Sequence, residues 1–170
     1  ILAALILSPL STMGAALHIA VHAFGKITLF MAAGAIYTAA HKTKVSELAG
    51  IGRRMPWTMG AFAIGALSMI GLPPAAGFIS KWYMLLGAME VEQWFAVAVI
   101  LGSTLLNAAY FLPILYTAFL KPEAADGHGH EHGEAPLPIV LALVTTAAGT
   151  ILLFLIPGPA LELAARLVGQ

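Results

Sequence analysis

The chain has 170 residues, of which 60% are hydrophobic and only 9% are charged. A soluble domain is about a quarter charged, so this composition excludes an ordinary water-soluble protein and indicates a membrane protein. The net charge is zero and cysteine is absent, which excludes disulfides and thiolate metal sites and gives no sign of a nucleic-acid partner. Because the sequence starts at Ile1 without an initiator methionine, we expect a fragment of a longer chain.

Successive apolar stretches predict an all-α, polytopic bundle of transmembrane helices. We expect helices at about residues 11–38, 57–70, 78–89, 94–120 and 137–156, with polar loops at 41–56 and 121–135. We therefore treat residues 1–170 as a single membrane-embedded unit. The first loop holds several basic residues against one acid, Glu47, and the positive-inside rule puts such a loop on the cytoplasmic side.

A cluster of helix-breaking residues interrupts the second apolar stretch. Gly71, Pro73, Pro74 and Gly77 fall within seven residues, and such a run cannot continue an α-helix. The sequence stays apolar through the interruption, so we expect the break to lie within the bilayer and to be packed against protein or to line a wet cavity. Helices interrupted in this way are the best sequence pointer to the ion site of a transporter.

Three ionisable residues lie four positions apart inside the first long helix. His18, His22 and Lys26 therefore share one helix face and span roughly 12 Å along the axis. Ionisable residues within a membrane helix normally serve a pathway or a pairing, so we predict a hydrated proton relay. The alternative is structural: the histidines hydrogen-bond to other helices and the lysine extends to the interface.

Lys81, which follows the break by one helical turn, is the fourth candidate for the relay. Its charge would lie near the middle of the membrane, where broken helices expose backbone groups to ions. The alternative is an interfacial lysine beside Trp82, because tryptophan favours the membrane boundary.

Metal binding is a weaker hypothesis at two places. His18 and His22 have the spacing of a zinc pair, but no carboxylate or thiol lies nearby in the sequence and Lys26 would repel the cation. His128, His130 and His132 alternate in the second loop, and His-rich tracts can bind metal. Ordering that loop would cost backbone entropy, so a solvated connector is favoured. We predict no metal site and no cofactor.

Two ordered motifs carry a resemblance to a known family. The patterns His18-x-x-x-His22-Ala-Phe-x-Lys26-x-x-x-Phe30 and Gly71-Leu-Pro-Pro-x-x-Gly77-Phe-x-Ser-Lys81 resemble the antiporter-like membrane subunits of respiratory complex I (NADH-quinone oxidoreductase) and of Mrp-type monovalent cation/proton antiporters. The stretches Asn107-Ala-Ala-Tyr-Phe-Leu-Pro113 and Glu134-Ala-Pro136 look most similar to the D-type membrane protein of the Mrp antiporters. The resemblance covers nearly the whole chain, which would match the C-terminal third of a family member.

The resemblance implies a role for each candidate. In the family, the lysine matching Lys26 lies mid-membrane in a proton path, and the histidines matching His18 and His22 line that path. The position matching Lys81 is a lysine or a glutamate on a broken helix. The glutamate and partner lysine of the family's N-terminal half fall outside this chain, so the resemblance implies one half-channel.

We therefore expect a proton-translocating subunit of a monovalent cation/proton antiporter, with Na⁺ as the expected exchanged ion. Its expected partners are the lipid bilayer and other membrane subunits of a hetero-oligomeric complex in a bacterial cytoplasmic membrane. One alternative is a complex I subunit, whose parent would be part of an enzyme, and nothing in the residues separates it from the antiporter. The other alternative is a scaffold subunit without transport.

Overall fold

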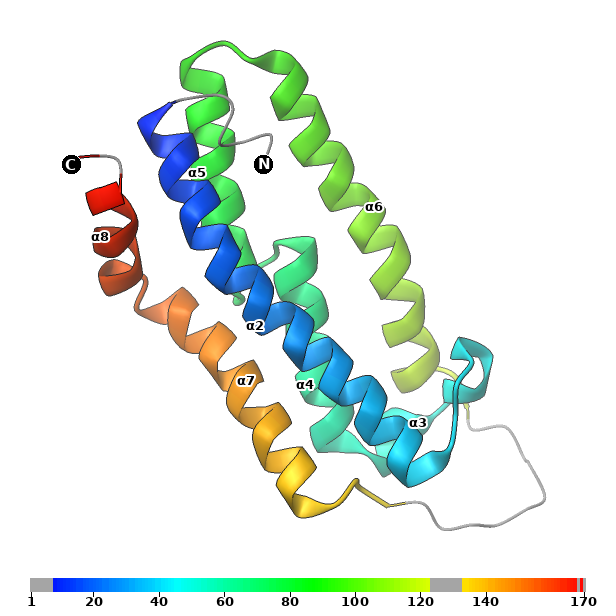
Figure 1. The fold of residues 1–170 in the computed structure, drawn as a ribbon. Coiled ribbons are helices and arrows are strands. Elements are labelled where there is room, and N and C mark those ends of the chain that lie inside the picture. Colours follow the sequence, from blue (N-terminus) through cyan, green and yellow to red (C-terminus); the bar gives the residue numbers. More distant parts are fainter. Residues whose placement is uncertain (1–7, 123–132, 168, 170) are drawn as a thin grey trace.

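The computed structural model describes residues 8–122, 133–167 and 169, which form a helical bundle with no strand among them (Figure 1). In chain order the elements are α2 (Pro9–Ala40), the short 3₁₀ helix η1 (Val45–Leu48), α3 (Ile51–Arg54), α4 (Pro56–Ile70), α5 (Gly77–Glu90), α6 (Trp94–Phe119), α7 (Leu137–Leu155) and α8 (Gly158–Leu167). The predicted all-α class with a discontinuous helix is confirmed.

Helix α2 is the longest element and packs against α4, α5, α7 and α8. It extends two residues beyond the expected range at each end. Ser8 precedes it in extended backbone, and Pro9 occupies the first turn, where a missing N–H costs nothing. At the other end His41 adopts a left-handed conformation with φ 52°, and its N–H donates to the Tyr37 carbonyl.

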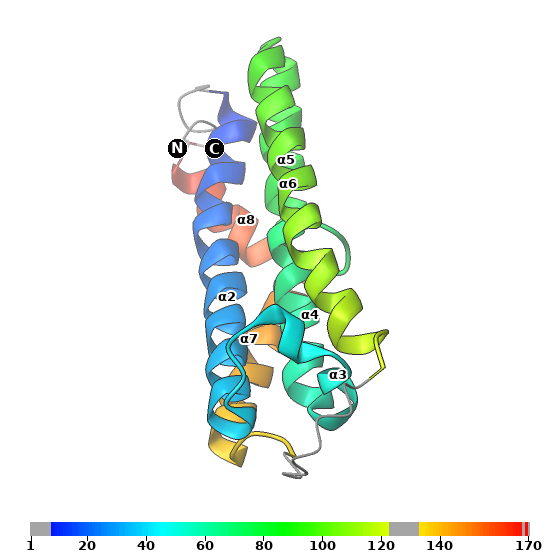
Figure 2. The ribbon, with the colours of Figure 1, turned by 90° about the vertical axis from the view of Figure 1, so that its right-hand side faces the viewer.

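Among the described residues, three helices, α2, α6 and α7, are long and apolar enough to cross a bilayer. Helix α4 is apolar but has only 15 residues, about 22 Å at 1.5 Å per residue, which is short of the bilayer core. Both ribbon views show α5 continuing the course of α4 beyond the interruption (Figures 1 and 2). Together the two helices therefore form one discontinuous crossing.

The basic loop after α2 is more ordered than its composition suggests, because Glu47 organises it. The Glu47 carboxylate accepts from the backbone N–H groups of Thr43 and Lys44, both at 3.2 Å, and these bonds hold its pKa below the ordinary value. The Lys42 ammonium donates to the Glu47 carbonyl at 2.7 Å. Glu47, the one acid among the basic residues of this loop, thus shapes the turn through backbone bonds.

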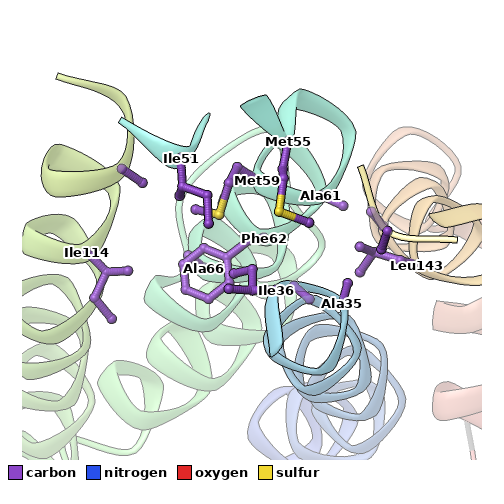
Figure 3. Packing of buried hydrophobic residues seen from close by; sticks show 14 of the residues in the cluster. Ala35, Ile36, Ile51, Met55, Met59, Ala61, Phe62, Ala66, Ile114 and Leu143 are labelled. Carbon is purple, nitrogen blue, oxygen red and sulfur yellow. The ribbon is translucent and has the colours of Figure 1, made fainter. Parts of the chain in front are cut away.

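The largest hydrophobic cluster is centred on α4 (Figure 3). Met55 and Met59 are fully buried there and face side chains from α2, α6 and α7. Gly65 lets α2 approach closely, because a Cβ at that position would lie 3.3 Å from side-chain atoms of Thr28 and Leu29. Most of α4 is buried, apart from a partly open side that carries Trp57, Gly60 and Ile64, and this burial holds the short helix within the bundle.

The break between α4 and α5 depends on two glycines with different tasks. Gly71 ends α4 with φ 89°, a left-handed conformation that glycine adopts without strain, and its N–H donates to the Leu67 carbonyl. Gly77 opens α5 so close to α4 that a Cβ there would overlap the Ser68 carbonyl oxygen. Pro73 and Pro74 lie between them and are exposed on the described chain.

The N-terminus of α4 is capped by a carboxylate from the distant end of the second loop. One oxygen of Glu134 accepts from the Trp57 and Thr58 N–H groups at 2.6 and 3.3 Å, and the other accepts from the Thr58 hydroxyl at 2.7 Å. A negative charge is favourable at the positive end of a helix dipole. The loop is therefore tied to α4 just before α7 begins.

We predict that Gly77→Ala severely destabilises the full-length protein, by about 3 kcal/mol or more, because the added methyl must displace the α4 backbone. The yield of folded protein and its melting temperature in detergent should both fall. Gly34→Ala on α2 is the matched control, since nothing lies within 4 Å of its added Cβ. Equal behaviour of the two variants would contradict the proposed close contact.

Removal of the distant cap should cost less. We expect Glu134→Ala to lower the free energy of unfolding by about 1–2 kcal/mol, since two backbone N–H groups at the start of α4 lose their acceptor. Glu134→Gln keeps an acceptor oxygen without the charge, so its free energy of unfolding should lie between those of the parent and Glu134→Ala. Glu162→Ala changes an exposed acid on α8 and serves as the control. A Glu134→Ala protein that melts like the control would refute the cap.

Candidate functional site

Lys81 projects from the first turns of α5 back to the C-terminal end of α4. Its Nζ donates to the carbonyl oxygens of Met69 at 3.0 Å and Ile70 at 2.8 Å, and to the hydroxyl of Thr104 on α6 at 3.2 Å. These carbonyls belong to the last turn of α4, where no further helical N–H can reach them. A positive charge is also favourable at the negative end of the helix dipole.

Helix α6 adds a second donor to the same helix end. The Nδ2 group of Asn107, one turn beyond Thr104, donates to the Met69 carbonyl at 3.3 Å. Trp82, in contrast, is exposed and stacks on Phe78 with ring centroids 5.9 Å apart. Lys81 therefore faces the helix break, while its neighbour faces outward.

His18 connects the ionisable face of α2 to α5. Its Nδ1 lies 2.8 Å from the Ser80 hydroxyl, which itself donates to the Gly77 carbonyl at 3.2 Å. A hydroxyl has one hydrogen, so with that hydrogen on Gly77 the bond to His18 is donated by the imidazole N–H. The His18 and His22 ring centroids are 5.7 Å apart. His18 and His22 thus lie next to each other on α2, and His18 is bonded to Ser80, the residue that precedes Lys81.

Lys26 lies apart from this network and is exposed on the chain. Its Nζ is 5.9 Å from the centroid of the Phe30 ring. It lines a cavity of about 330 Å³ between α2, α4 and α6, together with Met69 and Tyr110. Within the described residues, apolar side chains therefore enclose Lys26 on only part of its surface.

Several polar groups near the break were not singled out from the sequence. Ser80 and Thr104 contact the candidates directly, and the signal that could have found them is a hydroxyl within an otherwise apolar membrane helix. Ser68, on the last turn of α4, is buried and its hydroxyl has no hydrogen-bond partner among the described residues. The break is therefore lined with more hydrogen-bonding groups than its charges alone suggest.

The structure does not test metal binding by the loop histidines. His128, His130 and His132 lie outside the described residues. Within the part of the chain that is described, no group of three His, Cys, Asp or Glu side chains could hold a metal ion. The roles of Lys26, His22, His18 and Lys81 in proton transfer likewise remain predictions.

A family model described as "NADH:quinone oxidoreductase/Mrp antiporter, TM" matches residues 1–107 of this chain. The matched region contains the ionisable face of α2, the break and Lys81. It also includes Thr104 and Asn107, the two α6 residues that contact this site.

Curated relatives are similar to the chain over only part of their own length. NADH-quinone oxidoreductase subunit N from Desulforudis audaxviator (strain MP104C) is 45% identical over 129 residues, which is 76% of this chain and 25% of that protein. Hydrogenase-4 component B from Escherichia coli (strain K12) is 29% identical over 160 residues, or 88% of this chain and 24% of that protein. The matched part of the chain thus spans about a quarter of these relatives.

Solved structures share the fold. The Mrp complex from Dietzia sp. DQ12-45-1b matches with a TM-score of 0.81 and 22% identity, over 94% of this chain and 38% of that one. Respiratory complex I from Thermus thermophilus matches with a TM-score of 0.67 and 22% identity, over 91% and 35% of the two chains. The predicted family is confirmed, whereas the narrower likeness to the D-type Mrp protein is not. The chain belongs to the antiporter-like membrane subunits of the NADH:quinone oxidoreductase/Mrp antiporter family.

Proposed function

We propose that this chain carries one proton half-channel of a larger membrane subunit, with Lys81, His18, His22 and Lys26 as its proton-holding groups. The observation that carries the proposal is the position of the Lys81 ammonium at the C-terminal carbonyls of an interrupted helix. Membrane transporters bind ions and protons at such helix ends. The bond between His18 and Ser80 supports a continuous route, since it joins the α2 groups to the residue before Lys81.

The relay requires water between some of its members. Side chains four residues apart on α2 are separated by roughly 6 Å along the axis, which is too far for direct proton transfer. The cavity beside Lys26 offers room for water. Its wall includes Met69, and the Met69 carbonyl accepts a hydrogen bond from Lys81. We infer that protons cross this interval through waters held between the two lysines.

Two kinds of parent complex could drive this half-channel. Identity of 45% to a NADH-quinone oxidoreductase subunit favours a complex in which a redox reaction drives proton movement. Exchange of protons for Na⁺ or another monovalent cation is the second candidate, favoured by the Asn107–Pro113 and Glu134–Pro136 stretches that resemble the D-type Mrp protein. In both cases the partners are other membrane subunits in a bacterial cytoplasmic membrane, and this chain itself needs no cofactor.

Purification of the assembly around the tagged full-length protein distinguishes the two parents. Redox subunits in the purified complex, with proton uptake into vesicles that requires an electron donor, would support the first. Proton movement driven by a Na⁺ gradient without an electron donor would support the second. An assembly that moves no protons under either condition would leave the chain a scaffold and refute the proposal.

We predict that Lys81→Arg abolishes proton flux while it preserves the fold. Arginine can donate to the same carbonyls of α4, but it keeps its proton at any accessible pH. Flux into vesicles should fall at least roughly hundredfold, as expected for loss of a proton-transfer group. The melting temperature should stay near that of the parent. Lys121→Arg, at an exposed position outside the helices, is the control. Normal flux in Lys81→Arg would make Lys81 a structural cap only.

Lys26→Arg should fail for the same reason, although Lys26 caps no helix end among the described residues. A fixed positive charge preserves any structural attraction but cannot release a proton. Lys26→His should retain part of the flux with an optimum at more acidic pH, because imidazole titrates lower than an amine. The pH profile of flux in vesicles tests both variants. Near-normal flux with arginine would remove Lys26 from the relay.

A further inference from the structure

The surroundings of Lys81 match the charged form of its side chain. An ammonium group has three N–H donors and no acceptor. The three oxygens that receive them are the Met69 carbonyl, the Ile70 carbonyl and the Thr104 hydroxyl. Each donor thus has an acceptor, and the charged state is fully satisfied at this site.

The neutral form of the same side chain needs a different partner. A neutral amine has two N–H donors and one lone pair, so one of its three neighbours must become a donor. Backbone carbonyls cannot donate, and a buried lone pair opposite a carbonyl oxygen would be unfavourable. Only the Thr104 hydroxyl can rotate to donate, because a hydroxyl both donates and accepts. Thr104 is therefore the one direct contact that satisfies Lys81 in both states.

We propose that Thr104 is the relay residue through which Lys81 exchanges its proton, an inference that rests on the proposed half-channel. An N–H bond of the ammonium breaks as a new O–H bond forms on Thr104. The original hydroxyl proton leaves at the same time to a water molecule on the far side. Thr104 stays neutral, and its new hydrogen points to the lone pair of the amine. The charge thus moves from Lys81 to water without an ionised threonine.

The placement of Thr104 on α6 suits this step. Thr104 is half-buried on α6, and its sequence neighbours Ser103 and Leu105 are exposed on the described chain. Asn107 bonds the Met69 carbonyl from the same helix and holds α6 against the break.

Few other ionisable groups face this site. Helix α4 carries none, and α2 contributes His18 through its bond to Ser80. The ionisable side chains of α6 are Tyr110 and Tyr116, of which Tyr110 lines the cavity beside Lys26. The pH dependence of flux at Lys81 is thus set within a small group, in which Thr104 is the only hydroxyl bonded to the lysine among the described residues.

The test compares Thr104→Val with Thr104→Ser in the full-length protein, reconstituted into vesicles within its complex. Valine preserves the shape and removes the hydroxyl, so flux should fall at least roughly tenfold at every pH, whereas serine should stay within about twofold of the parent. Thr145→Val on α7 is the matched control, because that hydroxyl donates only to the Leu141 carbonyl of its own helix. Thr104→Ser and Thr145→Val should melt close to the parent, whereas Thr104→Val should melt somewhat lower, because the Lys81 ammonium loses one acceptor.

The pH profile separates a relay from a passive contact. If Thr104 only solvates the ammonium, Thr104→Val shifts the profile along the pH axis and preserves its maximum, which would overturn the inference. Flux that is low at every pH in Thr104→Val and is restored in Thr104→Ser supports the inference. Failure of this inference is distinct from failure of the proposed function. In the first case Lys81→Arg still abolishes flux while Thr104→Val does not, and in the second Lys81→Arg itself conducts normally.

Discussion

The architecture depends on how the C-terminal end of α4 is satisfied inside an apolar bundle. A helix that stops partway through a membrane leaves carbonyl groups without partners, and no water from a lipid-facing side can serve them. In this chain the Lys81 ammonium and the Asn107 amide reach the carbonyls from α5 and α6. The break is compatible with an apolar bundle because two other helices supply its missing donors.

The opposite end of α4 obeys the same rule with the opposite charge. Glu134 accepts from the first N–H groups of the helix, while Lys81 donates to its last carbonyls. Acid at the N-terminus and base at the C-terminus complement the helix dipole. Since both groups come from other segments, the position of α4 is determined by the loop before α7 and by α5 together. Buried contacts around Met55 and Met59 fix the lateral position of the helix within the bundle.

Much of the fold can be predicted from the sequence, because its signals are long apolar runs and residues that cannot continue a helix. Apolar runs indicate α2, α6 and α7, and two glycines with two prolines leave no way to continue α4. The contacts across the break are different, since they join residues such as His18 and Ser80 that are distant in the chain. Helical spacing places His18, His22 and Lys26 on one face, yet it cannot tell that, among the described residues, His18 alone of the three is hydrogen-bonded to α5. The packing of α2 on α5, through Gly14 near Ser80 and Met84, decides this.

The same contacts that stabilise the break also set the condition for its chemistry. Lys81 can be a proton carrier only if the end of α4 tolerates both its charged and its neutral form. A purely structural lysine would be served as well by carbonyl oxygens alone, which accept from every N–H of the charged form but offer no donor to the lone pair of the neutral form. At this site one of the three partners is a hydroxyl, which can exchange acceptor for donor. A cap built entirely from carbonyls would favour only the charged form, so the mixed cap is the feature that makes this helix end suitable for proton transfer.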